Sequence, residues 1–334
     1  MYDWAEFRHF LYLLKILELG GLHRAAEVLH TSQPNLSVQA RQFQDHAEIK
    51  LFSKERNGRI VPTETGYAFI SLAPLVLDVR DEVIDALIAI DRGGIDNIRL
   101  GCSPLVDQGL FRDLCALHRE ILPRCNVRPS HEDTVQLTQE VVSGNLDAAL
   151  VTLPVNHTDL QVEVLRQDRL VVCLRKDDPI AEKAAIDMAD LQNKLAVLYH
   201  PLRHPDAHQR LLEMLGQEGV KVEEFSRASH PTEMQMLVKE GYGFALIREG
   251  TPLDDELTTR RLIGVDWTVD IAAIFNRQNH PKTVPVLVRK LRKKIQHSAK
   301  PSGPKKPPAS VRPQAEVDRD KRQTGFQFPP IREA

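Results

Sequence analysis

The sequence predicts an α/β protein with a helical N-terminal part and a larger part in which strands and helices alternate. Two observations carry this prediction. Apolar residues recur at helical spacing over the first 50 positions, whereas short apolar runs alternate with amphipathic stretches between residues 97 and 297. The length of 334 residues, with 42% hydrophobic and 27% charged side chains, is typical of two or three soluble domains.

Three short helices are expected before residue 50. The first ends at Gly20-Gly21, the second spans about 23–29, and the third begins at Thr31-Ser32, where a hydroxyl cap precedes Pro34. The third helix should bury one face, made of Leu36, Ala40 and Phe43. A β-hairpin over 53–63, with Asn57-Gly58 at its turn, follows these helices. The first 63 residues therefore form one unit.

This unit has the pattern of a winged helix-turn-helix, with the helix-turn-helix at about 22–41. Small amides and hydroxyls can read base edges, and arginines can hold phosphates of double-stranded DNA. The candidate DNA-binding residues are Ser32, Gln33, Pro34, Asn35, Ser37, Val38, Arg41, Arg56 and Arg59. Periodicity alone leaves an alternative open, a plain three-helix bundle whose polar face is only solvated.

Residues 64–92 are predicted to be a linker that is helical to about Asp91. Its apolar stripe consists of Leu72, Val76, Val79, Val83 and Leu87. A stripe of this extent is not stable alone in water, so the helix should dimerise or pack on the rest of its own chain.

Beyond residue 97 an α/β domain with a largely parallel sheet is expected to run to 297. Its strands should lie near 98–103, 148–153 and 170–174, and its helices near 110–122, 134–144, 206–217 and 231–241. Residues 298–334 hold eight Lys/Arg against four Asp/Glu, and seven of the 21 prolines follow residue 300. Such a segment should be a disordered basic tail.

Several other classes of protein are disfavoured. The four cysteines, none in a C-x-x-C pair, should be buried reduced thiols. No apolar run is long enough to span a bilayer and no signal peptide is evident, so a cytoplasmic protein without membrane contact is expected. His200, His204 and His208 have helical spacing, but Pro201 and Pro205 interrupt it, which favours a loop over a metal site. No phosphate loop or G-x-S-x-G is present, so no catalytic residue or cofactor is predicted.

The N-terminal residues resemble the LysR-type transcriptional regulators. The resemblance rests on the segments Phe7-Arg8-x-Phe10-Leu11, Ala25-Ala26-Glu27-x-Leu29-His30, Ser32-Gln33-Pro34-x-Leu36-Ser37-x-Gln39, Leu51-Phe52 and Pro62-Thr63-Glu64-Thr65-Gly66. It continues in Gly144-Asn145-Leu146-Asp147-Ala148-Ala149-Leu150 and Leu237-Val238-x-x-Gly241-x-Gly243. It covers about residues 2–296.

This resemblance implies a regulator that binds DNA, responds to a small-molecule effector such as an organic anion, and forms a homodimer or homotetramer. Residues 1–63 would bind DNA, and the helix of 64–92 would pair with its copy. A periplasmic-binding-protein-like domain at 97–297 would hold the effector between two lobes, 97–165 with 266–297, and 166–265. Ligands in such sheets lie beyond strand ends and near helix N-termini, and this geometry selects Ser103, Thr134, His230 and Thr232 as effector-binding residues. Thr152, Pro201 and His204 are expected as further residues of the site wall. Each hydroxyl could instead be a helix cap.

The chain departs from the family pattern at four informative positions. Val38 replaces the usual arginine on the exposed face of the third helix, and Lys54 replaces another arginine. Glu48 stands where glycine is usual, and Arg248 where proline is usual, so its guanidinium would face an anionic ligand or solvent. A solute-binding protein or an enzyme of the same α/β class, with an N-terminal bundle used only for association, is the competing interpretation.

Overall fold

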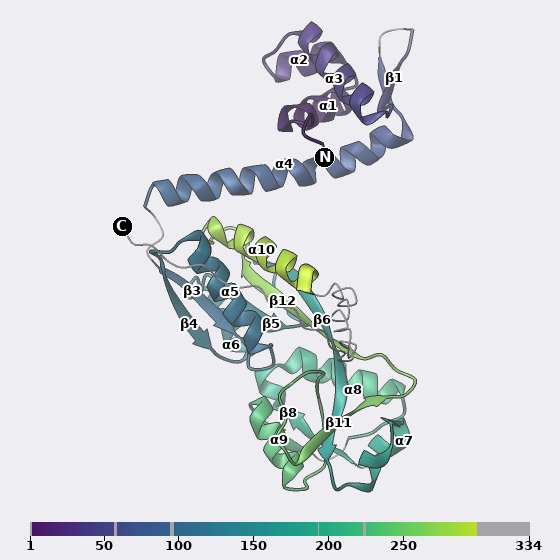
Figure 1. The fold of residues 1–334 in the computed structure, drawn as a ribbon, viewed down its shortest axis with the longest axis vertical. Helices are drawn as coiled ribbons and strands as arrows, with labels where there is room; N and C mark the ends of the chain where they lie inside the picture. The colour runs from purple at the N-terminus through teal and green to yellow at the C-terminus, as the bar shows by residue number, and fades with distance from the viewer. Residues whose placement is uncertain (1, 57–58, 94–96, 193, 223–224, 299–334) are drawn as a thin grey trace, which may run out of the picture.

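The structure, a computed structural model, describes residues 2–56, 59–93, 97–192, 194–222 and 225–298. Figure 1 shows a helical N-terminal unit, one long helix beneath it, and an α/β part made of two lobes. The predicted tail lies outside the described residues except for Ser298, which is the last residue of the final helix rather than part of the tail.

The N-terminal unit contains the expected helices and hairpin. Its elements are α1 (Phe7–Leu19), α2 (Leu22–Val28), α3 (Gln33–Ala47), β1 (Phe52–Lys54) and β2 (Ile60–Pro62). Gly20 ends α1 in the left-handed conformation with φ of 64°, which explains the glycine there. Leu13, Leu36 and Leu51 are fully buried in the core that the three helices share. The predicted helices and core face of α3 are confirmed.

The linker helix α4 (Glu64–Asp91) starts at Thr63, whose hydroxyl accepts a hydrogen bond from the backbone N–H of Gly66 at 3.1 Å. Phe69 of α4 stacks on Phe10 of α1 with ring centroids 5.8 Å apart, which joins the helix to the N-terminal unit. In its second half Glu82 pairs with Arg289 of the α/β part at 2.8 Å. The helix therefore contacts its own chain near its start and in its second half, but several of its apolar side chains still face water: Leu72, Leu75, Val83, Ile84, Leu87 and Ile88.

The outer pairs of strands in the α/β part run parallel, as expected, but the central pairs run antiparallel, so the sheet as a whole is mixed. Its strands are β3 (Asn97–Cys102), β4 (Asn126–His131), β5 (Ala148–Thr152), β6 (Leu160–Arg175), β7 (Ala185–Ile186), β8 (Leu195–Tyr199), β9 (Ser226–Ala228), β10 (Phe244–Arg248), β11 (Leu257–Leu262) and β12 (Thr268–Asn276). The order is β4-β3-β5-β12-β6-β10-β8-β9, and β11 joins β6 to β7. The central strands β6 and β12 run antiparallel to each other and to their outer neighbours, β10 and β5.

Helices cover both faces of each lobe. They are α5 (Gln108–Ile121), α6 (Thr134–Val142), α7 (Met188–Leu191), α8 (Pro205–Gln217), α9 (Pro231–Lys239) and α10 (Thr283–Ser298), with short 3₁₀ turns at Pro179–Glu182 and Pro201–Arg203. In the first lobe α5 and α10 pack on one face and α6 on the other. In the second lobe α8 and α9 take opposite faces. Strand residues are therefore buried from both sides.

The long strand β6 carries the chain from the first lobe to the second. Residues 160–169 of β6 pair with β12, and residues 170–173 pair with β10. Only the second stretch was expected, because residues 170–174 are continuously apolar whereas 161–169 are mostly polar. All four cysteines are buried and free, as predicted. No helix among the described residues is long and apolar enough to cross a membrane.

Candidate functional sites

The exposed face of α3 holds most of the predicted DNA-binding residues. Leu36 and Ala40 anchor the helix in the core, so the opposite side of the helix faces outward. Outward-facing positions are Gln33, Pro34, Asn35, Val38 and Arg41, whereas Ser37 is half-buried beside them. Val38 is 51% exposed, which is unusual for a valine in the middle of a helix.

The start of α3 is held by its own side chains. The Ser32 hydroxyl accepts a hydrogen bond from the backbone N–H of Asn35 at 3.3 Å, so it caps the helix. The Asn35 side-chain amide donates to Thr31 Oγ1 at 3.0 Å, which leaves its carbonyl oxygen to accept from another group. Ser32 thus has a local structural role, and Asn35 keeps one acceptor facing outward.

A histidine that sequence reasoning missed holds α3 against α1. His9 is 6% exposed, and its Nδ1 accepts from the backbone N–H of Glu6 at 3.0 Å. Its proton must therefore lie on Nε2, which donates to Gln39 Oε1 at 2.8 Å. Helical spacing places His9 on the apolar side of α1, but only packing shows that its partner is a polar residue of the third helix.

The hairpin formed by β1 and β2, the wing, carries the other predicted DNA-binding residues. Arg56 and Arg59 are exposed on either side of the turn, and the turn residues 57–58 lie outside the described residues. The backbone N–H of Glu55 donates to the Arg59 carbonyl at 2.9 Å, which closes the hairpin. Arg41 of α3 has no ion pair or hydrogen bond among the described side chains, so its charge is available to an external anion.

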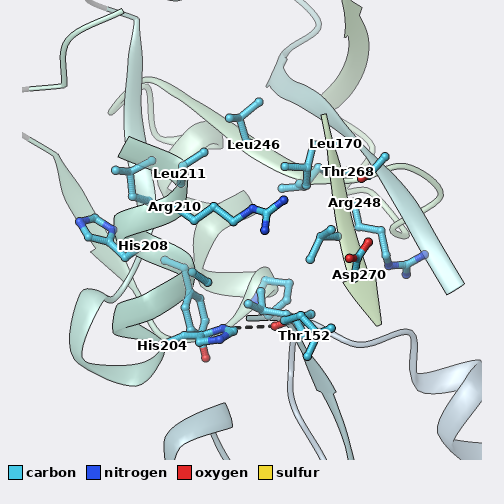
Figure 2. Close-up of a pocket in the computed structure, with 18 of the residues that line it drawn as sticks. Thr152, Leu170, His204, His208, Arg210, Leu211, Leu246, Arg248, Thr268 and Asp270 are labelled. Atoms are coloured by element: carbon cyan, nitrogen blue, oxygen red, sulfur yellow. Dashed lines mark hydrogen bonds between the residues drawn. The ribbon is translucent and has the colours of Figure 1, made fainter. Parts of the chain in front are cut away.

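A cavity of about 160 Å³ lies where the two lobes meet. Thr152, at the end of β5, and His204, at the start of α8, are the two predicted effector-binding residues that line it (Figure 2). His204 Nε2 lies 3.0 Å from the carbonyl oxygen of Pro154, which can only accept, so Nε2 carries the proton. Nδ1 then accepts from the Thr152 hydroxyl at 3.3 Å. Burial lowers the pKa of His204, which keeps this neutral tautomer.

The other five predicted effector-binding residues do not line this cavity. Ser103 and Thr134 are buried, and Thr134 Oγ1 lies 3.3 Å from Ser103 Oγ, so the two hydroxyls are each other's partners. His230 Nδ1 accepts from the backbone N–H of Thr232 at 3.2 Å, which caps α9. Pro201 begins a 3₁₀ turn before α8. These residues shape the elements around the cavity.

A cluster of four charged groups joins the lobes near the cavity. Arg166, on β6, pairs with Asp107 of the first lobe at 3.2 Å and with Asp168 at 2.7 Å. Arg248, at the end of β10, lies 3.7 Å from Asp168 and also lines the cavity. The pKa of the Asp107 carboxyl is lowered overall: burial acts to raise it, but hydrogen bonds from Gly109 and Arg166 outweigh burial. Arg248 therefore faces an acidic group of its own chain in addition to the cavity.

Two charged cavity residues were not predicted. Arg210 lies on α8 and Asp270 on β12, 60 positions apart in the sequence. Neither belongs to a motif, and only the meeting of the lobes brings them to one cavity (Figure 2). The three spaced histidines have separate partners: His200 caps a turn, His204 holds Thr152, and the His208 ring lies 5.4 Å from the Phe225 ring.

Two family models match the chain. One, described as a bacterial regulatory helix-turn-helix protein of the lysR family, matches residues 7–67, and the LysR substrate binding domain matches residues 92–296. The RuBisCO operon transcriptional regulator of Allochromatium vinosum is 26% identical over 261 residues, which are 76% of this chain and 83% of that protein. The transcriptional regulator CatR of Pseudomonas putida is 28% identical over 244 residues, 72% and 82% of the two chains.

Solved structures show the same fold. Full-length BenM superposes with a TM-score of 0.55 and 21% sequence identity, over 88% of this chain and 98% of BenM. CbnR, described as a LysR family transcriptional regulator, superposes with a TM-score of 0.51 and 19% identity, over 86% of this chain and all of CbnR. The joined arrangement of helix-turn-helix, long helix and two-lobed domain therefore recurs in these proteins.

Proposed function

This chain belongs to the LysR family of bacterial regulatory proteins, and we propose which of its residues bind DNA and which respond to a ligand. The protein is a DNA-binding transcriptional regulator that responds to a small-molecule effector and forms oligomers, and its relatives are regulators rather than enzymes. We assign DNA binding to residues 1–63, dimerisation to 64–92 and effector binding to 97–297. A regulator of bacterial genes acts where the chromosome lies, in the cytoplasm.

The exposed face of α3 carries the DNA-binding proposal. We place α3 in the major groove, where Gln33, Asn35 and Ser37 read base edges and Arg41 holds a phosphate. Val38 offers a methyl-lined surface instead of the usual arginine, which suits contact with a thymine methyl group. Arg56 and Arg59 of the wing add phosphate contacts, which raise affinity without reading sequence.

The exposed apolar stripe of α4 supports dimerisation. Its own chain covers neither Leu72 nor Leu87, each of which is 60% exposed. A second copy of the helix, lying antiparallel, would bury these residues and contribute hydrophobic stabilisation. The same pairing would bring two α3 helices to one DNA, as a two-fold half-site arrangement requires.

Effector binding is proposed at the cavity between the lobes. Thr152 and His204 come from different lobes and line the same cavity, so a ligand in the cavity can contact both lobes. A ligand that binds one arrangement of the lobes better than another shifts the population of the dimer toward that arrangement. In this scheme Ser103, Thr134, Pro201, His230 and Thr232 hold the elements around the cavity and do not contact the ligand.

The salt dependence of binding to duplex DNA tests the DNA-binding assignment. Affinity should fall linearly with the logarithm of salt concentration, and Arg41→Ala should reduce the slope by about 0.9 per lost phosphate contact. Ser37→Ala should cost about 1–3 kcal/mol on the preferred operator and little on random DNA. Arg119→Ala, an exposed arginine of the α/β part, is the matched control. Unchanged operator affinity in both α3 variants would remove this helix from recognition.

A further inference from the structure

The cavity between the lobes has a mostly apolar wall. Most of the side chains that form it come from the second lobe, and they include Leu170, Leu198, Leu211, Met214 and Leu246. Removing water from such a wall is favourable, so the body of a ligand that fills it should be apolar. A volume of about 160 Å³ suits a compact molecule rather than a nucleotide or a peptide.

Arg210 provides the cation of this cavity. Its guanidinium extends from α8 into the space between the walls (Figure 2). Among the described residues it has neither an ion pair nor a hydrogen bond, in contrast to Arg248, whose charge faces Asp168 at 3.7 Å. A guanidinium beside an apolar wall favours a carboxylate, because two parallel hydrogen bonds satisfy both groups.

The wall formed by the first lobe offers hydrogen-bond acceptors. The Thr152 hydroxyl proton is used by His204 Nδ1, because the Pro154 carbonyl requires the His204 proton on Nε2. Thr152 therefore presents only its oxygen lone pairs. Asp270 lies on the same wall, since Leu153 donates its backbone N–H to the Asp270 carbonyl at 2.9 Å. One oxygen of its carboxylate accepts from Gln167 at 2.9 Å, which leaves the other to accept from a ligand.

We propose that the cavity binds a compact, largely apolar monocarboxylate that also carries a hydrogen-bond donor, either a hydroxyl or an ammonium group. The carboxylate lies on Arg210, the apolar body contacts Leu170, Leu211 and Leu246, and the donor reaches Asp270 or Thr152. This inference rests on the proposed effector role of the cavity. Because Arg210 belongs to the second lobe and Asp270 to the first, such a ligand connects the two lobes.

Isothermal titration of the full-length protein with four acids tests this assignment. The probes are para-hydroxyphenylacetate, L-phenylalanine, phenylacetate and glutarate. We expect para-hydroxyphenylacetate or L-phenylalanine to bind at least about tenfold more tightly than phenylacetate, which lacks a polar donor, and glutarate to bind most weakly. Tighter binding of para-hydroxyphenylacetate than of L-phenylalanine identifies a hydroxyl as the donor, and the reverse order identifies an ammonium.

Two variants test whether the Arg210 guanidinium and the Asp270 carboxylate contact the ligand. Arg210→Met keeps the length and apolar character of the side chain but removes its charge, and should weaken binding of the preferred acid at least about tenfold. Asp270→Asn should reduce the preference of the protein for the donor-bearing acid over phenylacetate. The matched control is Arg203→Met, because Arg203 also lies close to α8 but pairs with Asp133 outside the cavity.

Three results would overturn the inference: no saturable binding of either donor-bearing acid, equal affinity for phenylacetate, or unchanged binding by Arg210→Met. Binding of duplex DNA by the same preparations separates this failure from failure of the proposed function. If wild type and Arg210→Met both bind DNA with a normal salt slope while no acid binds, the regulator assignment stands and the ligand class is wrong.

Discussion

Gly66 lies where the linker helix α4 meets the base of the wing. Adding a methyl group there should disrupt the packing of α4 against the wing. A Cβ atom at this position would lie 2.0 Å from the carbonyl oxygen of Leu51 and 3.1 Å from Pro62 Cβ. The Leu51 carbonyl cannot retreat freely, because it accepts a hydrogen bond from the backbone N–H of Thr63 at 2.9 Å and the Leu51 side chain is fully buried.

The expected cost of Gly66→Ala follows from these contacts. Relieving the overlap needs a backbone shift of about 1 Å, and overpacking of this kind costs about 1–3 kcal/mol. Weakening the hydrogen bond between Thr63 and Leu51 adds about 1 kcal/mol. Alanine recovers at most about 1 kcal/mol through its better helix propensity. We therefore expect a net destabilisation of about 1–3 kcal/mol, confined to the N-terminal unit.

Urea denaturation with a fluorescence signal from Trp4, which packs on Phe43 in this unit, measures the loss. Operator affinity should fall in parallel, whereas ligand binding by the α/β part should not change. Gly216→Ala is the control, because Gly216 lies in α8 and a Cβ there meets no atom within 4 Å. That variant should gain up to about 1 kcal/mol. Wild-type stability and DNA binding in Gly66→Ala would refute the reasoning.

Four further predictions follow from single features. Glu48 ends α3 in the left-handed conformation with φ of 54°, so Glu48→Gly should stabilise the N-terminal unit by about 0.5–1 kcal/mol in the same denaturation assay. Leu87→Glu should dissociate the dimer in analytical ultracentrifugation while leaving the monomer folded, and an unchanged sedimentation coefficient would exclude α4 as the interface. Burial lowers the pKa of His118, whose ring nitrogens have no partner among the described residues, so the unfolded chain takes up its proton first and stability should fall as pH drops below about 6.5. His118→Leu should flatten that decline in urea midpoints measured between neutral and mildly acidic pH. Deleting residues 299–334 should leave the melting temperature and operator preference unchanged and weaken binding to random DNA only at low salt; loss of folding would show that the tail packs on the body.

The N-terminal site could be predicted from the sequence because its determinants are local. The cap at Ser32, the proline at Pro34 and the spacing of Leu36 and Ala40 lie within a few residues of one another, and together they decide which side of α3 is exposed. The same holds for Gly20 and for the apolar stripe of α4. Thr152 and His204 were expected only as wall residues of the effector site, and both line the cavity.

Only the tertiary structure decided which polar groups near the strand ends reach the cavity. Ser103 and Thr134 have the expected strand-end and helix-start positions, but packing brings them together as a buried pair away from the cavity wall. Arg210 and Asp270 carry no local signal in the sequence, and both line the cavity only because the two lobes meet there. The first part of β6 was likewise decided by tertiary structure, because the backbone groups of the mostly polar residues 161–169 pair with β12, a strand about 100 positions later in the sequence.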